Sequence, residues 1–274
     1  MIRPSPLPGF GLGMGILLMA LTLVVLLPLG TLIGRGVLMG PVELWQHLGS
    51  KRVASALVLS FRSALVASAF NLVFGLLLAW VLTRYRFPGR RLVDAALDLP
   101  FALPTAVAGI ALTALYAPNG TFGKLLEPLG LQVAYTEAGI WLALVFVGLP
   151  FVVRTVQPVI EEIDPEWEEA SATLGASRLR TMVRVVLPML TPALLTGFAL
   201  ALARSVGEYG SVIFIAGNLP NVTEIAPLLI VIRLEEYNYD AATAIGLAML
   251  GISFAMLLLI NLFQVWGRRR VGHV

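Results

Sequence analysis

An arginine and a glutamate lie four residues apart inside an otherwise apolar stretch of the chain. Arg204 and Glu208 both fall within residues 192–216, and side chains spaced by four share one face of an α-helix. Charged groups at membrane depth are costly and face a bundle interior or a wet pathway. Either Arg204 attracts and passes an anion that Glu208 helps to orient, or the two form an internal ion pair that fixes packing or a gate. The ion pair is the favoured interpretation, because conduction requires sites weak enough to release their ion.

Prolines and hydroxyl groups provide further candidates for a translocation path. Pro104, Thr105 and Ser205 join the two charged residues as candidate pathway residues. Single hydroxyls within membrane spans more often bond the backbone of their own helix, and this is the competing interpretation. Pro100 and Pro104 interrupt one apolar run, which predicts a bent span at that point.

The segment from about residue 160 to 188 is longer, more charged and more strongly patterned than the other connections. Asp164 followed by Pro165 favours a helix start, with a carboxylate as N-cap and a proline in the first turn. Gly175 offers the left-handed conformation that ends a short helix, and Ser177 is placed to cap a second helix. The sequence therefore predicts a helix–turn–helix, acidic at its front and basic at its back, that forms a docking element at a membrane face.

Residue patterns for enzymatic chemistry are missing from the sequence. The chain contains no cysteine, which excludes disulfides, thiol catalysis and cysteine-based metal sites. It has no GxxxxGK[ST] phosphate-binding loop and no HExxH motif, and serine and histidine are not arranged as a catalytic pair. We therefore expect no catalytic residue, no metal site and no cofactor bound by this chain, and any energy from ATP must come through a partner protein.

The composition indicates a membrane protein. Of the 274 residues, 58% are hydrophobic and 13% are charged, with a mean hydropathy of +0.88, whereas soluble domains carry about 25% charged residues. A membrane span needs roughly 20 mostly apolar residues. Six such runs predict an all-α polytopic membrane protein with one transmembrane domain over residues 1–274 and with spans at 9–33, 63–83, 99–116, 138–159, 192–216 and 241–266.

Basic residues divide unequally between the two sides of the predicted membrane. Positive charge resists translocation, so the richer side is predicted to be cytoplasmic, with both termini inside. Arg154 shortens the apolar stretch of the fourth predicted span, and its side chain is expected to reach toward the cytoplasmic interface. The richer side holds twelve of the nineteen basic residues, namely Arg3, Arg84, Arg86, Arg90, Arg91, Arg154, Arg178, Arg180, Arg184, Arg268, Arg269 and Arg270.

The charged segment between the fourth and fifth spans carries a recognisable spacing. It resembles the EAA signature of ABC-importer permeases, EAA-x3-G-x9-I-x-LP, with every spacing kept. Ser171 replaces an alanine and Val185 replaces the isoleucine. The matching residues are Glu169, Ala170, Ser171, Gly175, Val185, Leu187 and Pro188. Residues 82–90, 98–109, 150–158 and 204–218 further resemble the T-type permeases of sulfate/thiosulfate importers, and this likeness covers nearly the whole chain.

The resemblance implies a type I ABC importer permease fold, in which Glu169, Ala170, Ser171, Gly175, Leu187 and Pro188 belong to a coupling helix that docks on an ATPase. It further implies a non-catalytic permease of the bacterial inner membrane that moves sulfate or thiosulfate from periplasm to cytoplasm. The implied partners are a second permease of the related W type, two ABC ATPase subunits that use ATP and magnesium, a periplasmic binding protein for the anion, and membrane lipid, with no nucleic acid.

Two alternatives remain open for the transported ion and for the energy source. A molybdate or tungstate permease shares the coupling loop and the general build. A secondary anion transporter would need no ATPase, but inverted internal repeats would support it, and no convincing repeat is found. The coupling loop has no purpose in that second scheme.

Overall fold

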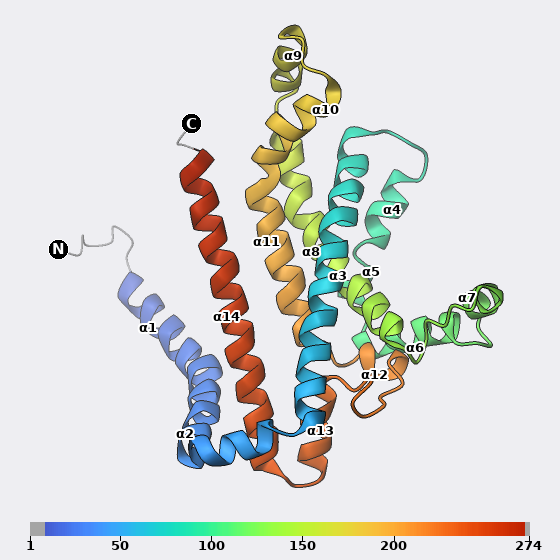
Figure 1. Ribbon diagram of the computed structural model, residues 1–274. Coiled ribbons are helices and arrows are strands. Elements are labelled where there is room, and N and C mark those ends of the chain that lie inside the picture. The colour runs from blue at the N-terminus through green and yellow to red at the C-terminus, as the bar shows by residue number, and fades with distance from the viewer. Residues whose placement is uncertain (1–8, 272–274) are drawn as a thin grey trace.

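Long apolar runs in the sequence become long helices in the computed structural model, which describes residues 9–271 (Figure 1). Five helical stretches are long and apolar enough to cross a membrane, and a sixth span results if one bent helix pair is counted as one. The expected all-α architecture is confirmed. The five stretches are Phe10–Leu48, Lys51–Arg84, Glu137–Glu162, Arg178–Val206 and Tyr239–Gln264, and the bent pair is Arg90–Ala102 with Thr105–Leu129.

The chain order of the helices shows short elements inserted between the long ones. The α-helices are α1 Phe10–Leu21, α2 Leu27–Leu48, α3 Lys51–Arg84, α4 Arg90–Ala96, α5 Leu99–Ala102, α6 Thr105–Tyr116, α7 Thr121–Leu126, α8 Glu137–Glu162, α9 Glu166–Thr173, α10 Arg178–Thr181, α11 Leu187–Val206, α12 Val212–Ile215, α13 Ala226–Glu235 and α14 Tyr239–Val271. The remaining turns are the π-helical η1 Thr22–Leu26 and η3 Met182–Val186 and the 3-10 turn η2 Glu127–Leu129.

Helices α3, α8 and α11 form the centre of the bundle (Figure 1). Small residues line the shared faces, and they let helix backbones approach closely where lipid gives no hydrophobic drive for association. A Cβ atom added to Gly75 of α3 would lie only 2.7 Å from Cγ1 of Val152 in α8. The crossing of α3 and α8 therefore depends on a residue without a side chain.

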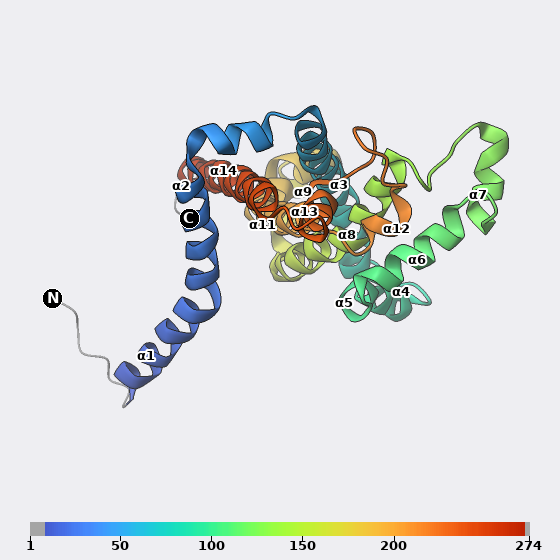
Figure 2. The ribbon, with the colours of Figure 1, turned by 90° about the horizontal axis from the view of Figure 1, so that it is seen from below.

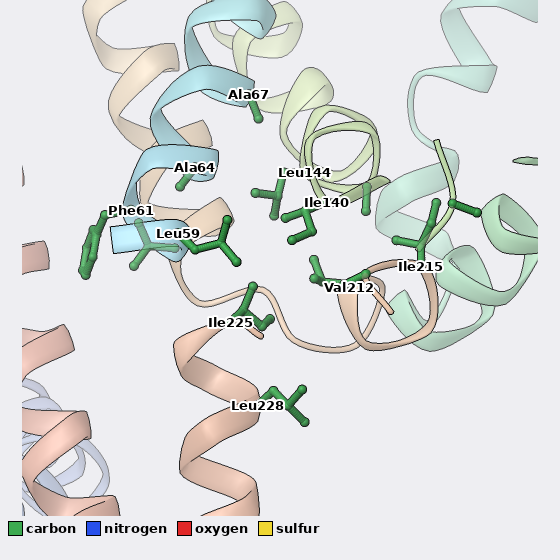
Figure 3. Close-up of a cluster of buried hydrophobic side chains, with 14 of the residues drawn as sticks. Leu59, Phe61, Ala64, Ala67, Ile140, Leu144, Val212, Ile215, Ile225 and Leu228 are labelled. Carbon is green, nitrogen blue, oxygen red and sulfur yellow. The ribbon is translucent and has the colours of Figure 1, made fainter. Parts of the chain in front are cut away.

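A second region of the core lies where the ends of α3 and α8 meet α12 and α13. Its buried side chains come from segments far apart in the sequence and point toward one another (Figure 3). They include Leu59 and Ala64 of α3, Ile140 and Leu144 of α8, Val212 and Ile215 of α12, and Ile225 and Leu228 at the start of α13. This cluster fixes the short helices against the long ones.

Two helical arms extend from opposite sides of the central bundle (Figure 2). Every residue of α1 is exposed, while α2 approaches α14, where a Cβ atom on Gly36 would lie 2.1 Å from Cδ1 of Leu247. The α6–α7 arm lies on the other side. Apolar surface of this extent in a membrane chain must be covered by lipid or by another subunit.

The predicted bend in the third span is confirmed, and it is sharp. The two halves, Arg90–Ala102 and Thr105–Leu129, meet at 117°. Pro104 precedes the first residue of α6 as its N-cap, and Leu103 is extended, as expected for a residue that precedes proline. Residues 99–116 are therefore two short helices rather than the single span that the hydropathy predicts.

The predicted fifth span, 192–216, is wrong at both ends. The helix begins at Arg178 and ends at Val206, and a non-helical link separates it from α12. Gly207 and Gly210 lie in this link and disfavour helix continuation. Hydropathy did not reveal the break because the residues beyond it remain apolar.

Two prolines are accommodated inside long helices by a local change of winding. Pro28 and Pro188 each follow a π-helical turn, and the residue before each proline donates its N–H across five residues, from Leu27 to Thr22 and from Leu187 to Met182. A proline has no N–H and clashes with the carbonyl four residues earlier, and a π turn relieves that clash locally. The helices therefore continue through both positions.

We predict that Gly75→Ala destabilises the bundle, because the new methyl group overlaps Val152. Overpacking of this kind costs about 1–3 kcal/mol. The measurement is the thermal unfolding midpoint in detergent. Gly251→Ala in α14 is the matched control, since a Cβ atom there meets nothing within 4 Å. Equal midpoints for the two variants would contradict the close α3–α8 contact.

Candidate functional site

Helix α9 starts where the sequence signals place it. The Asp164 carboxylate accepts a hydrogen bond from the N–H of Glu166 at 3.0 Å, and Pro165 occupies the N-cap position. Glu166, Glu168 and Glu169 fill the first turn, where negative charge is favoured by the helix dipole. The helix is therefore capped locally and does not depend on burial for its start.

The turn after α9 has the hydrogen bonds of a Schellman motif. The N–H of Ala176 bonds to the carbonyl of Ser171, and the N–H of Gly175 bonds to that of Ala172. Gly175 has a φ of 80°, a conformation that disfavours side chains. Ser177 then accepts a hydrogen bond from the N–H of Arg180 and caps the next helix. The predicted helix–turn–helix is present, but its second helix runs on without interruption into α11.

A pair of hydroxyl groups ties the two arms of this hairpin together. The Ser171 and Thr181 side-chain oxygens lie 2.8 Å apart, and Thr181 is buried. Ser171 is one of the two positions, with Val185, at which the chain departs from the EAA signature. The sequence does not predict this contact, because Thr181 lies ten residues away and no pattern links the two residues.

The tip of the hairpin exposes large apolar side chains beside its charges. Trp167 is 55% exposed, Leu179 is 74% exposed and Leu174 is 88% exposed. Exposed apolar groups rimmed by charge are typical of a surface that binds another protein. Glu169 and Ala170 are exposed on the same helix, whereas Leu187 and Pro188 lie farther along, at the start of α11.

Arg204 and Glu208 form an ion pair with 2.6 Å between Nη1 and Oε2. Glu208 lies two residues beyond the end of α11 and its side chain is 1% exposed. Its other carboxylate oxygen accepts hydrogen bonds from the N–H and the hydroxyl of Ser211, both at 2.9 Å. Because both carboxylate oxygens are engaged within the chain, the geometry fits the packing role better than a role in binding an anion.

The other candidate pathway residues lie around the same break. Thr105 contacts Gly210, where a Cβ atom would lie 2.2 Å from the Thr105 hydroxyl, and Pro104 precedes it at the bend. Ser205 is buried and faces a small cavity beside Ser60 and Glu208. Within the described residues, the Ser205 hydroxyl has no hydrogen-bond partner. The structure therefore brings the bend of the third span and the end of the fifth together.

Arg154 is held by several partners within the chain. Its guanidinium binds both carboxylate oxygens of Asp98 at 2.9 and 2.7 Å, the carboxylate and carbonyl of Asp94, and the amide oxygen of Gln157. A bidentate arginine–carboxylate pair has a fixed geometry. The interaction holds α4 and α5 against α8, and sequence reasoning missed it because the partners are 56 and 60 residues away.

A bundle of membrane-length helices with a polar helix–turn–helix between α8 and α11 is the architecture of a multi-pass membrane protein. Residues 71–273 match the family described as "Binding-protein-dependent transport system inner membrane component". Because the match spans most of the sequence, the chain belongs to this family.

Relatives and solved structures agree with that assignment. The "Sulfate transport system permease protein CysT" of Escherichia coli (strain K12) is 51% identical over 97% of both chains. The protein of the same name from Synechocystis sp. is 47% identical over 91% of this chain and 87% of its own length. The fold matches the crystal structure of "a bacterial ABC transporter involved in the import of the acidic polysaccharide alginate", with a TM-score of 0.73 and 18% identity over 97% of both chains.

We predict that Arg204→Ala lowers the stability of the permease more than the double change Arg204→Ala with Glu208→Ala. The single variant leaves a buried carboxylate without its counter-ion, which costs about 3–5 kcal/mol, and the double variant removes that carboxylate too. The measurement is the unfolding midpoint and the yield of assembled complex. A stable, assembled Arg204→Ala variant that has lost transport would instead assign Arg204 to the pathway.

Proposed function

We propose that the chain is the membrane-spanning permease subunit of an ATP-driven importer that carries sulfate, and with it thiosulfate, from the periplasm to the cytoplasm. The observation that carries the proposal is the 51% identity, over 97% of both chains, to a sulfate transport permease. The exposed hairpin supports it, because a helix–turn–helix with apolar groups at its tip suits the docking of a second protein.

The ATP-hydrolysing machinery belongs to separate subunits in this proposal. Two ABC ATPases use ATP and magnesium, and the hairpin around Glu169, Ala170, Ser171 and Gly175 docks on one of them. A related W-type permease covers part of the exposed apolar surface, and a periplasmic binding protein delivers the anion. The family description, which names binding-protein-dependent transport, supports this set of partners.

The orientation follows from the distribution of charge. Arg84, Arg86, Arg90 and Arg91 follow α3 or begin α4, and the hairpin carries Arg178, Arg180 and Arg184. These two segments lie at the same end of the bundle (Figure 1). Since positive charge is retained on the cytoplasmic side, the hairpin and both termini face the cytoplasm. Arg3 and residues 272–274 lie outside the described residues.

Transport proceeds by alternating access in this scheme. ATP binding closes the two ATPases and displaces the hairpins that dock on them. The capped α9, its Schellman turn and the continuous helix from Arg178 to Val206 then carry the displacement into the membrane. The helices open toward the binding protein, and hydrolysis resets them.

The test is labelled-sulfate uptake in cells that lack their own sulfate importer. We predict uptake only when this chain is expressed with its permease, ATPase and binding-protein partners, with competition by thiosulfate and little by molybdate. Dominant competition by molybdate or tungstate would assign the alternative substrate. Uptake by this chain alone that survives ATP depletion would make it a secondary anion transporter.

We predict that Gly175→Val uncouples ATP hydrolysis from transport. A side chain at a left-handed residue costs roughly 1–2 kcal/mol, so the turn is distorted and roughly fivefold less sulfate is moved per ATP hydrolysed. Gly89→Val is the matched control, because Gly89 has a φ of 84° at the N-cap of α4 and lies outside the hairpin. Equal losses in the two variants would show that general strain, rather than the hairpin, is responsible.

A further inference from the structure

A single arginine joins the end of α3 to the hairpin. Arg84 is the last residue of α3. Its Nη2 lies 3.0 Å from Oε1 of Glu168 in α9 and 3.5 Å from the carbonyl oxygen of Ile163. Ile163 is buried in the core beside α8. Arg84 therefore contacts both α9, which moves in the proposed mechanism, and Ile163, which is buried and precedes α9.

The guanidinium of Arg84 is held on a second side by an aromatic ring. Its central carbon lies 5.3 Å from the ring centroid of Trp80, one turn earlier on α3, a distance suited to a cation–π interaction. The side chain of Arg84 is 22% exposed and that of Glu168 is 37% exposed. This ion pair is more sheltered than an ordinary surface pair, which contributes little, and Trp80 orients it.

Hydrophobic packing does not fix the position of α9. None of the eight residues of α9, all of which the structure describes, is buried. A cavity of about 510 Å³ lies beside the helix, lined by Trp80, Tyr85, Glu168, Glu169, Arg178 and Met182 among others. The hairpin can therefore shift without disrupting a packed core, and its position relative to α3 depends on the Arg84 contact.

Helix α3 can pass such a shift across the whole protein. It runs without a break for 34 residues, from Lys51 to Arg84, and packs along α8 and α11. At its other end, Arg52 binds both carboxylate oxygens of Glu224, at 2.7 and 2.6 Å, in the link before α13. Helix α3 is therefore continuous and has a polar contact at each end, and it connects the hairpin with the link before α13 at the other end of the bundle.

We propose that Arg84 is a positioning residue that transmits the displacement of α9 to α3, so that the hairpin drives two membrane helices, α11 by direct continuation and α3 through the Arg84–Glu168 ion pair. The proposal rests on the proposed function only in that α9 is taken to dock on an ATPase. Without Arg84, α9 moves while α3 stays in place, and ATP is hydrolysed without full opening.

The test combines a distance with a coupling ratio in the assembled complex in lipid nanodiscs. The chain has no cysteine, so a spin label on Leu77→Cys in α3 and one on Glu166→Cys in α9 are the two labels that it carries. Both native side chains are exposed, and neither belongs to the apolar surface at the hairpin tip. With Arg84 present, the α3–α9 distance stays narrow with and without trapped ATP. In Arg84→Ala we expect a broader distribution of the α3–α9 distance and roughly fivefold less sulfate moved per ATP hydrolysed. A fivefold change corresponds to about 1 kcal/mol, which is the contribution expected of such an ion pair.

Variants separate transmission from simple misfolding. Arg86→Ala is the matched control, because Arg86 lies two residues away and is exposed, and we expect it to change neither readout. Arg84→Lys keeps the charge without the planar stacking and should give intermediate values. Glu168→Gln should act like Arg84→Ala, and the two changes together should be no worse than either alone, because they break the same contact.

The outcomes distinguish this inference from the proposed function. Unchanged distances, an unchanged ratio in Arg84→Ala, or equal effects of Arg86→Ala would overturn the inference. A wild-type complex that moves no sulfate would refute the proposed substrate instead. In that case the label distances, together with ATP hydrolysis stimulated by the binding protein, would decide the role of Arg84.

Discussion

Lipid offers no hydrogen bonds to a peptide backbone, and this constraint decides where the chain can interrupt its helices. The interruption after α11 is covered by protein. The link after α11 lies against α6 so closely that a Cβ atom on Gly109 would sit 2.4 Å from the carbonyl oxygen of Ser211. Within that link, the N–H of Ser211 is taken by the Glu208 carboxylate. At Pro28 and Pro188, a π turn shifts the hydrogen bonds by one residue and the helix continues.

The same constraint explains where the arginine–carboxylate pairs lie. Arg204 and Glu208 secure the link after α11, and Arg154 with Asp94 and Asp98 secures the short helices before the bend. Arg52 with Glu224 secures the segment before α13, and Arg84 with Glu168 secures α9. Each of these four arginines lies on a long helix and joins it to a link or to a short helix, whereas Arg62 joins the long helices α3 and α8 through Glu137. Glu208 and Glu224 have side chains that are 1% exposed, so removing their arginine partners leaves a buried charge without its counter-ion, which is strongly destabilising. The pairs of Arg84 and Arg154 are more exposed and contribute less.

Local signals made the hairpin and the number of spans predictable, and non-local contacts remained hidden. Asp164, Gly175 and Ser177 act within a few residues of their own position, so capping and turn chemistry could be read directly from the sequence. Hydropathy did not predict the end of α11 at Val206, because it stays high beyond that residue. Gly207 and Gly210 were a local signal for the break. The partners of Arg154 and Arg84 lie 56 to 84 residues away, and nothing in one sequence links them. The contact between Thr105 and Gly210 likewise appears only in the fold.

Pairing of this kind bears on how a dianion can cross such a protein. A free arginine in the path would hold a dianion too tightly for release, because conduction needs sites that are weak as well as specific. Arg52, Arg154 and Arg204 each form an ion pair with a carboxylate of this chain. Their positive charge is therefore largely neutralised and stabilises the fold instead of binding an anion. In the proposed importer, the route is therefore better served by neutral groups, such as hydroxyls and backbone N–H groups at the bend near Thr105. Under the same proposal, strong selection of the anion belongs to the soluble binding protein, where many oriented donors can surround a tetrahedral oxyanion.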